Sequence, residues 1–402
     1  MKIPPPRGVW EICAGIIALA LVVGRAEAGG LQTVASLDSG SGDIPQAGLI
    51  AVGGTLYGTA AFGGANSDGT LFSWSSGNGL TTLASFDGAN GANPQAGLLA
   101  VGGTLYGTTY GGGAAPGDGT LFSWSASNGL STLASFDGTN GANPQARLLA
   151  VGGTLYGTTT GGGASGDGTL FSWSASNGLQ TLVNFDDTNG LSPKAGLLAV
   201  NGTLYGTTYA GGANGNGTLF SYASGTLTTL VNFGSANGGG PEGRLVAVNG
   251  TLYGTTYYGG AAGHGTLFSY ASGILTTLVN FDYPVGAYPV GGLLAVGGTL
   301  YGTTDYGGAN SDGTLFSWSP GNGLTTLASF DGTTGTEPFY ALTDVGGTLY
   351  GTAQYGGASN GGVIFSYTPA SQSVPEPGSL PLLLAGLGGL GALYLRRRLH
   401  LS

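Results

Sequence analysis

Four aspartates lie at equivalent positions of a recurring Asp-Gly-Thr-Leu-Phe-Ser pattern, namely Asp68, Asp118, Asp167 and Asp312. Two other copies of the pattern carry Asn216 and His264 instead. An aspartate before a glycine is a common turn residue because its carboxylate caps nearby backbone groups. Carboxylates and loop carbonyls are also the ligands that calcium prefers, although the spacing matches neither an EF-hand nor an Asp-rich nonapeptide. We expect turn capping, keep calcium binding as the alternative and expect no other cofactor.

Tyrosines follow a glycine-rich turn in most copies: Tyr110, Tyr209, Tyr257, Tyr258, Tyr306 and Tyr355. A tyrosine on a loop can stack on a sugar ring and hydrogen-bond its hydroxyls, or it can fill a gap between packed elements. The fifth copy diverges most, through Tyr257, Tyr258, His264, Tyr283 and Tyr288. A unique binding site, if the chain has one, is expected there.

Residues suited to catalysis are scarce. The only histidines are His264 and His400, and the only cysteine, Cys13, lies near the N-terminus. Glu242 and Glu337 depart from the repeat, and two carboxylates can hydrolyse a glycosidic bond, but nothing in the sequence places these two together. We therefore expect no enzyme, with a glycosidase or lyase as the remaining enzymatic alternative.

The elements that must position these residues form a tandem repeat. Thr-Leu-Tyr-Gly-Thr recurs every 48 to 50 residues, with its tyrosine at Tyr57, Tyr106, Tyr156, Tyr205, Tyr253, Tyr301 and Tyr350. Each unit contains four short apolar runs, which in the second unit are 98–101, 104–109, 119–125 and 130–136. Runs bounded by Gly, Asn and Asp predict strands, and Gly-Gly or Asn-Gly links predict tight hairpins. The glycine of the motif is expected to permit close approach between neighbouring units.

The runs are apolar on both faces, so each four-stranded sheet should be covered on both sides. This pattern predicts an all-β, seven-bladed β-propeller over residues 29–370, with a β-solenoid as the alternative. The last unit lacks a fourth run after residues 362–367, whereas residues 31–38 match a fourth run without a unit of their own. We expect this N-terminal strand to complete the last blade and close the ring.

Propeller geometry also predicts which loops meet. The loops after the second and fourth strands should emerge on one face, which would gather the aspartates and tyrosines named above together with Asp87, Asp137, Asp186, Asp282 and Asp331. The opposite face would carry only tight turns. Function is therefore expected on the first face.

The charge balance of the repeats is strongly acidic. Of the 19 acidic residues, all but Glu11, Glu27 and Glu376 lie between Asp38 and Asp344, where the only bases are Arg147, Lys194 and Arg244. Nucleic acid and anionic membrane surfaces are therefore poor partners. Such a surface suits cations or neutral glycans.

Both ends of the chain have the composition of targeting segments. Residues 1–28 read as a signal peptide, with a basic start, an apolar run over 12–23 and the small-x-small sequence Ala26-Glu27-Ala28; an uncleaved anchor is the alternative. At the other end, a linker over 371–379 precedes an apolar, Gly-rich run over 380–395 and Arg396, Arg397 and Arg398. The segment 380–402 is predicted to be a short transmembrane helix with a cytoplasmic basic tail.

Pro375-Glu376-Pro377, the apolar run and the three arginines resemble the PEP-CTERM sorting domain. The resemblance implies recognition and processing by an exosortase-type membrane enzyme in Gram-negative bacteria that make extracellular polysaccharide. It also implies a transient inner-membrane anchor, followed by release to the outer surface or extracellular matrix. A plain C-terminal membrane anchor is the alternative.

The repeat also resembles a known family. Leu-Tyr-Gly-Thr-Thr-Tyr-Gly-Gly, Gly-Thr-Leu-Phe-Ser and Leu-Thr-Thr-Leu-Val-Asn-Phe are similar to the GloVer-type tandem repeat of bacterial surface proteins. The resemblance implies an exported repeat protein and supplies no catalytic residues. We therefore expect a non-enzymatic cell-surface or matrix protein that serves adhesion or scaffolding linked to exopolysaccharide. The alternative hypothesis is a carbohydrate- or calcium-binding propeller.

Overall fold

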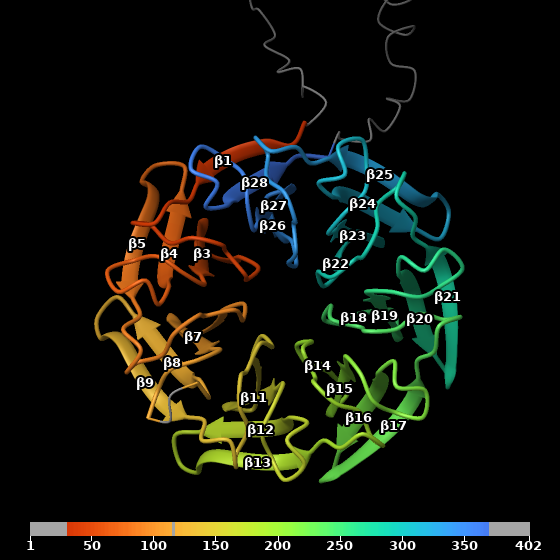
Figure 1. Cartoon of the computed structure of the whole chain (residues 1–402), viewed down its shortest axis with the longest axis horizontal. Helices are drawn as coiled ribbons and strands as arrows, with labels where there is room; N and C mark the ends of the chain where they lie inside the picture. Colours follow the sequence, from red (N-terminus) through yellow and green to blue (C-terminus); the bar gives the residue numbers. More distant parts are fainter. Residues whose placement is uncertain (1–29, 115–116, 370–402) are drawn as a thin grey trace, which may run out of the picture. The chain divides into compact units, whose positions relative to one another are not determined.

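A computed structural model describes residues 30–114 and 117–369, and these residues form seven antiparallel four-stranded sheets. The sheets are arranged as blades in a ring (Figure 1). The predicted all-β, seven-bladed propeller is therefore confirmed, and the solenoid alternative is wrong. Within the described ranges there is no helix of the length and hydrophobicity needed to span a bilayer. The predicted signal peptide, linker and tail helix lie outside the described residues.

Each blade begins with a short inner strand and continues outward, so that the fourth strand lies on the outside of the ring (Figure 1). The first strands are β2 (Ile50–Val52), β6 (Leu99–Val101), β10 (Leu149–Val151), β14 (Leu198–Val200), β18 (Val246–Val248), β22 (Leu294–Val296) and β26 (Thr343–Val345). The second strands carry the Thr-Leu-Tyr-Gly-Thr motif. They are β3 (Thr55–Ala60), β7 (Thr104–Thr109), β11 (Thr154–Thr159), β15 (Thr203–Thr208), β19 (Thr251–Thr256), β23 (Thr299–Thr304) and β27 (Thr348–Ala353).

The third strands are β4 (Thr70–Ser75), β8 (Thr120–Ser125), β12 (Thr169–Ser174), β16 (Thr218–Ala223), β20 (Thr266–Ala271), β24 (Thr314–Ser319) and β28 (Val363–Tyr367). The fourth strands are β5 (Gly79–Ser85), β9 (Gly129–Ser135), β13 (Gly178–Asn184), β17 (Thr226–Asn232), β21 (Ile274–Asn280), β25 (Gly323–Ser329) and β1 (Gln32–Ser36). We number the blades 1 to 7 in chain order from β2, so that blade 7 comprises β26, β27, β28 and β1. The four strands of blade 2 begin and end within one residue of their predicted bounds.

The hairpin turns follow from their sequences. Gly102 and Gly103, between β6 and β7, have φ angles of 58° and 82°, which is the double positive-φ geometry of a type I′ turn. Asn201 and Gly202 have 51° and 79° in blade 4. These turns match the twist of the strands they join, so the register of each inner hairpin is fixed locally.

The N-terminal strand closes the ring, as expected from the missing fourth run. β1 pairs antiparallel with β28, with Gln32 opposite Ser366 and Ser36 opposite Val363. A side-chain bond from the Thr33 hydroxyl to the carbonyl oxygen of Thr333, 2.8 Å away, links this strand to blade 6 as well. The first and last parts of the propeller are thus held in one sheet.

The hydrophobic core lies between the blades. In β8, Leu121 packs in a cluster shared with blade 3, whereas its neighbour Phe122 packs in a cluster shared with blade 1. Phe122 also meets Phe86 edge-on at a centroid distance of 5.1 Å. The expectation that both faces of each sheet are buried is confirmed.

The glycine of the repeated motif has a different role from the predicted one. A Cβ atom at Gly107 would lie 2.5 Å from Cζ of Phe122, the residue directly opposite it in the same blade. The glycine therefore makes room for a core phenylalanine within the blade, and the predicted approach between blades is wrong in this detail. Because every second strand pairs with a Phe-bearing third strand, the same constraint recurs around the ring.

Candidate functional site: the loop-rich face and the central cavity

The loops after the second and fourth strands share one face, as predicted, and they are tied together through backbone bonds. The amide of Ala92 donates to the carbonyl oxygen of Gly111 at 2.7 Å, and the amide of Asn93 donates to that of Asp68 at 2.9 Å. The second bond joins blade 1 to the loop that leads into blade 2. Equivalent bonds end on the carbonyl oxygens of Asp118, Asp167, Asn216 and His264. This position thus links neighbouring blades through its backbone.

Carboxylate capping occurs in the loop after the fourth strand. Oδ1 of Asp137 accepts the amides of Thr139 and Asn140, each at 2.9 Å, and these bonds lower its pKa. Oδ1 of Asp331 accepts the corresponding bonds from Thr333 and Thr334, which lower its pKa to about 2. These aspartates stabilise their own turns. In the described part of the chain no three His, Asp or Glu side chains are grouped so that they could hold a metal ion.

The tyrosines predicted from the fourth to sixth copies come together on this face. Five of them form a continuous series of ring contacts, which we call the tyrosine cluster: Tyr209, Tyr257, Tyr258, Tyr288 and Tyr306. Centroid distances run from 5.1 Å between Tyr257 and Tyr288 to 6.4 Å between Tyr257 and Tyr258. His264 lies at the edge of the cluster, where its Nδ1 is 3.1 Å from the hydroxyl of Tyr288. The centroid of its ring is 4.6 Å from that of Tyr283.

Tyr110 and Tyr355 lie outside the cluster. Each follows the second strand of its own blade, and each contributes backbone bonds to the adjoining loop, as in the 2.9 Å bond from the Tyr110 amide to the carbonyl oxygen of Asn93. The third copy carries Thr160 where blade 2 has Tyr110. The tyrosines are therefore gathered on one side of the ring, in blades 4 to 6.

A cavity of about 700 Å³ lies at the centre of the ring and is lined by residues from all seven blades. Its wall is built mainly from the short segment that follows a proline and precedes each first strand, and it includes the residue after the second strand in blades 4 to 7. The residue after the proline is Gln46, Gln95, Gln145, Lys194, Glu242, Val290 or Phe339 in blade order. The two halves of the ring therefore present different chemistry to the cavity.

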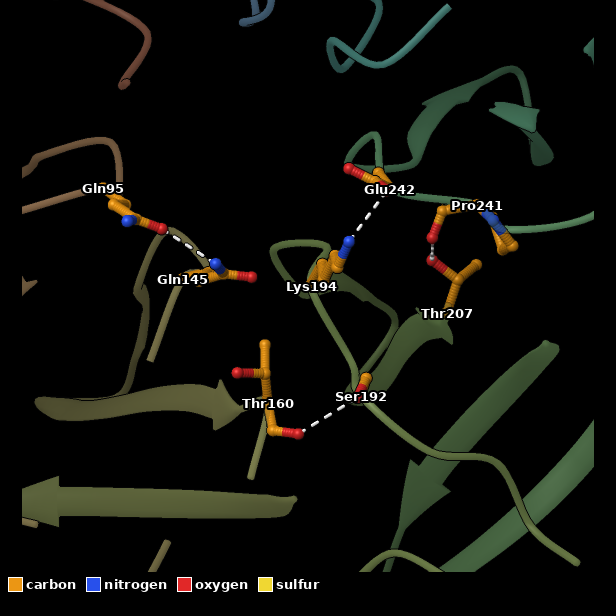
Figure 2. A network of polar contacts seen from close by, with 8 residues as sticks. All are labelled: Gln95, Gln145, Thr160, Ser192, Lys194, Thr207, Pro241 and Glu242. Atoms are coloured by element: carbon orange, nitrogen blue, oxygen red, sulfur yellow. Dashed lines mark hydrogen bonds and ion pairs between the residues drawn. The ribbon is translucent and has the colours of Figure 1, made fainter. Parts of the chain in front are cut away.

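Amides dominate the side of blades 1 to 3. Nε2 of Gln145 donates to Oε1 of Gln95 at 2.8 Å, so that amides of two neighbouring blades join (Figure 2). Nε2 of Gln46 is 3.4 Å from Oε1 of Gln354. Apart from Arg147 of blade 3, the side chains named on this side are polar and uncharged.

Charged side chains dominate the side of blades 3 to 7. Nζ of Lys194 lies 2.9 Å from Oε1 of Glu242, and the two side chains point toward one another across the boundary of blades 4 and 5 (Figure 2). The same ammonium lies 3.8 Å from the ring centroid of Tyr209, a cation–π contact. Burial raises the pKa of Glu242, while the charge of Lys194 opposes that shift. The lysine thus couples the tyrosine cluster to the cavity.

Asp305 is the most buried acid of the cavity wall, with only 3% of its surface exposed. Burial raises its pKa to about 8, and the nearby charges of Glu337 and Glu242 act in the same direction. Tyr306, the next residue, donates its hydroxyl to Oε1 of Glu337 at 3.4 Å. This shift favours the protonated form at neutral pH, in which the carboxyl group can donate a hydrogen bond.

The cavity was missed at the sequence level, although its signal is present. Glu242 and Glu337 stand out as departures from the repeat, but only the ring brings them to one wall together with Asp305. The charged departures from the repeat in the segment after this proline all line the cavity, namely Arg147, Lys194, Glu242 and Arg244. Aligning the seven copies by blade position would have grouped these residues.

Fold and site together define a repeat propeller with a central polar cavity. The chain belongs to the Gloeobacter/Verrucomicrobia repeat family, whose model matches residues 25–220, 117–299 and 271–376. A PEP-CTERM protein-sorting motif matches residues 373–398. The motif marks an exported protein that is transiently anchored in the membrane, is processed by the exosortase system and is linked to exopolysaccharide. Both predicted resemblances are therefore confirmed.

Solved structures share the fold at low sequence identity. The extracellular domain of a protein described as a hybrid two-component system from B. thetaiotaomicron matches with a TM-score of 0.59 and 13% identity, over 85% of this chain and 40% of that structure. The chain thus spans less than half of that relative. A protein described as a 6-phosphogluconolactonase from Bacteroides uniformis matches with a TM-score of 0.52, 16% identity and coverage of 74% and 88%. The N-terminal domain of Nup159 matches with a TM-score of 0.50 and 10% identity, over 85% of this chain and 96% of that structure.

These likenesses show the fold alone. A comparison with curated protein sequences finds no match. The function of the site must therefore be argued from its own residues.

Proposed function

We propose that the protein binds extracellular polysaccharide at the tyrosine cluster and acts, without catalysis, as an adhesive or scaffolding component of the outer surface or matrix. The observation that carries the proposal is the unbroken series of five tyrosines beside the cavity, three of which, Tyr209, Tyr257 and Tyr306, line its wall. Tyrosines supply apolar faces for sugar rings and hydroxyls for their polar edges. A sorting signal that implies export supports this proposal, because extracellular polysaccharide lies outside the cell.

The chemistry around the cluster supports a glycan more than a protein partner. The same cavity offers the amides of Gln95 and Gln145 from blades 2 and 3, and amides hydrogen-bond sugar hydroxyls as both donors and acceptors. Three members of the cluster line the cavity and carry polar hydroxyl groups, whereas stable protein interfaces need a broad, well-packed apolar centre. The remaining blades have near-identical sequences, and we interpret them as a rigid support for the blades that carry the tyrosine cluster.

The test is a binding assay of the full-length protein on an array of bacterial polysaccharides and oligosaccharides. We expect binding by the unaltered protein and a loss of about two- to tenfold in affinity for Tyr257→Ala, since aromatic contacts contribute about 0.5–1.5 kcal/mol. Tyr110→Ala is the matched control, because Tyr110 holds the same blade position outside the cluster. Absence of binding at millimolar sugar, or an equal loss in the control, contradicts the proposal.

Glycan cleavage is a second candidate, favoured by one observation. Asp305 is protonated at neutral pH beside Glu337 and Glu242, and a glycosidase needs one protonated and one ionised carboxyl group. In this candidate Asp305 would protonate the leaving oxygen while Glu337 would activate a water that adds to the sugar. Release of new reducing ends by the unaltered protein, abolished in Asp305→Asn, would replace the non-enzymatic proposal by this one.

A further inference from the structure

All three lysine and arginine side chains of the described residues line the central cavity: Arg147, Lys194 and Arg244. The rest of the propeller surface carries only acidic charges. Basic residues in a chain of this composition are therefore concentrated at one place on the ring axis. From this arrangement we infer that the cavity is a specific site for a carboxylated sugar, a uronic acid residue, whose carboxylate is held by Arg147 and Arg244. The inference rests on the proposed function and names the class of saccharide that the cavity selects.

The two arginines are built into the ring by the blades that precede them. Nε of Arg147, in blade 3, donates to the carbonyl oxygen of Leu98 in blade 2 at 2.9 Å, and its stem lies over Gly97. Arg244, in blade 5, donates Nε to the carbonyl oxygen of Leu197 in blade 4 at 3.0 Å, and its stem lies over Gly196. Fixing Nε in this way orients each guanidinium and leaves its terminal NH₂ groups for a ligand.

Gly196 lies between the two side chains. A Cβ atom at this glycine would be 3.4 Å from Cδ of Arg244 and 3.5 Å from Cβ of Arg147. The arginines therefore flank one small residue on the same wall. Each of these side chains, from blades 3 and 5, offers a forked set of donors that matches the planar, bidentate shape of a carboxylate.

Neither guanidinium is neutralised by the protein. Among the described residues the only ion pair joins Lys194 and Glu242. Burial, together with the charge of Arg244, lowers the pKa of Arg147 to about 10. Burial disfavours the charge of both arginines, and the charge of Arg244 adds to this effect at Arg147, so a ligand carboxylate gains affinity here.

A buried acid provides a second, independent indication of a ligand. Asp305 lines the same cavity, and only 3% of its surface is exposed. Its Oδ1 has no hydrogen-bond partner within the described structure. A buried polar atom without a partner is costly. A ring oxygen or hydroxyl of the sugar would satisfy it, with the protonated carboxyl as donor or acceptor.

Size and charge agree with this ligand. A cavity of about 700 Å³ falls in the usual range for small-molecule sites. With Asp305 protonated, three cations face the two carboxylates of Glu242 and Glu337, so the pocket carries an excess of positive charge. A neutral sugar uses the tyrosines and amides but gains nothing from the arginines.

The experiment compares glucuronate-containing oligosaccharides with their carboxyl-reduced neutral counterparts by calorimetry on the full-length protein. We expect the acidic form to bind at least about tenfold more tightly, since charge-assisted bonds contribute about 1.5–3 kcal/mol. Arg244→Gln should remove this preference, measured as the ratio of the affinities for the acidic and the neutral oligosaccharide. Arg244→Lys keeps the charge without the fork and should give an intermediate preference; it serves as the second variant if Arg244→Gln does not fold.

The outcomes separate the two proposals. Equal binding of acidic and neutral oligosaccharides by the unaltered protein overturns the uronate site and leaves polysaccharide binding intact. Binding of neither form overturns both proposals. Inorganic phosphate or sulfate that binds as tightly as the acidic sugar, and displaces it, shows a simple anion site and overturns the assignment to a sugar carboxylate.

Discussion

Arg244 reaches across the face of Gly196 and donates its Nε–H to the carbonyl oxygen of Leu197, 3.0 Å away in the preceding blade. Arg147 repeats this relationship with Gly97 and Leu98. Each arginine of the cavity wall is thus positioned by the glycine that the previous copy of the repeat carries at the equivalent place. Specificity in this ring depends on pairs of neighbouring copies, one that supplies a long side chain and one that leaves room for it.

Replacing this glycine, Gly196, should therefore displace the arginines although neither arginine is itself substituted. Gly196→Val adds branches to a Cβ that would already lie 3.2 Å from the backbone oxygen of Arg147 and 3.4 Å from Cδ of Arg244. We expect the acidic-sugar preference to fall at least about fivefold, with a stability loss of about 1–3 kcal/mol, as for overpacked sites. Gly77→Val is the matched control, since no atom lies within 4 Å of a Cβ there. A preserved preference in Gly196→Val would show that the arginines are not held in this way.

The glycine of the repeated motif gives a prediction about the core. In Gly107→Ala the new methyl group meets Cζ of Phe122 at 2.5 Å, and a close-packed core relaxes only in part. We expect a loss of about 1–3 kcal/mol in the free energy of urea unfolding. Adding Phe122→Leu should recover part of the loss in the double variant, whereas Gly77→Ala should change stability by less than about 0.5 kcal/mol. Additive losses in the double variant contradict the proposed clash.

The strands, turns and closure were predictable because they depend on local rules repeated seven times. The repeated apolar runs, the Gly-Gly turns and the unmatched fourth strand at residues 31–38 can all be recognised in the sequence. The role of Gly107 was not predictable in full, since a glycine in a strand indicates close approach but not which partner approaches. Only the register places Phe122 opposite it.

The cavity depends on a different kind of information. Arg147, Glu242 and Asp305 are single departures that lie in three different copies, far apart in the chain. Their convergence follows from the closure of the ring, which turns an equivalent blade position into a shared wall. The tyrosine cluster was partly foreseen because Tyr257, Tyr258 and Tyr288 crowd into one copy, but its extension to Tyr209 and Tyr306 required neighbouring blades to be placed.

Closure by the N-terminal strand should contribute strongly to stability. Deleting residues 30–36 leaves β28 as an open edge, since β1 is its outer partner. Open edges invite pairing with other chains. We expect a lower melting temperature and concentration-dependent association in sedimentation experiments. A synthetic peptide of residues 31–38 added in excess should restore the melting temperature, whereas a peptide of the same composition in scrambled order should not; unchanged stability of the truncated protein would contradict the closing role.

Asp305 should give the protein a distinctive dependence of stability on pH. Its pKa is about 8 in the folded protein against an ordinary value of 3.8, so between these values the folded state binds one more proton than the unfolded state. Stability contributed by this proton is fully present below about pH 4 and is lost as pH rises to about 8, by at most about 1.4 kcal/mol per pH unit. In Asp305→Asn, which cannot titrate, the fall in melting temperature between pH 5 and pH 8 should be smaller than in the unaltered protein. Asp331→Asn is the control, because the pKa of Asp331 is about 2 and its titration lies below this window; an unchanged slope in Asp305→Asn would show that this carboxyl group is ionised in the folded protein at neutral pH.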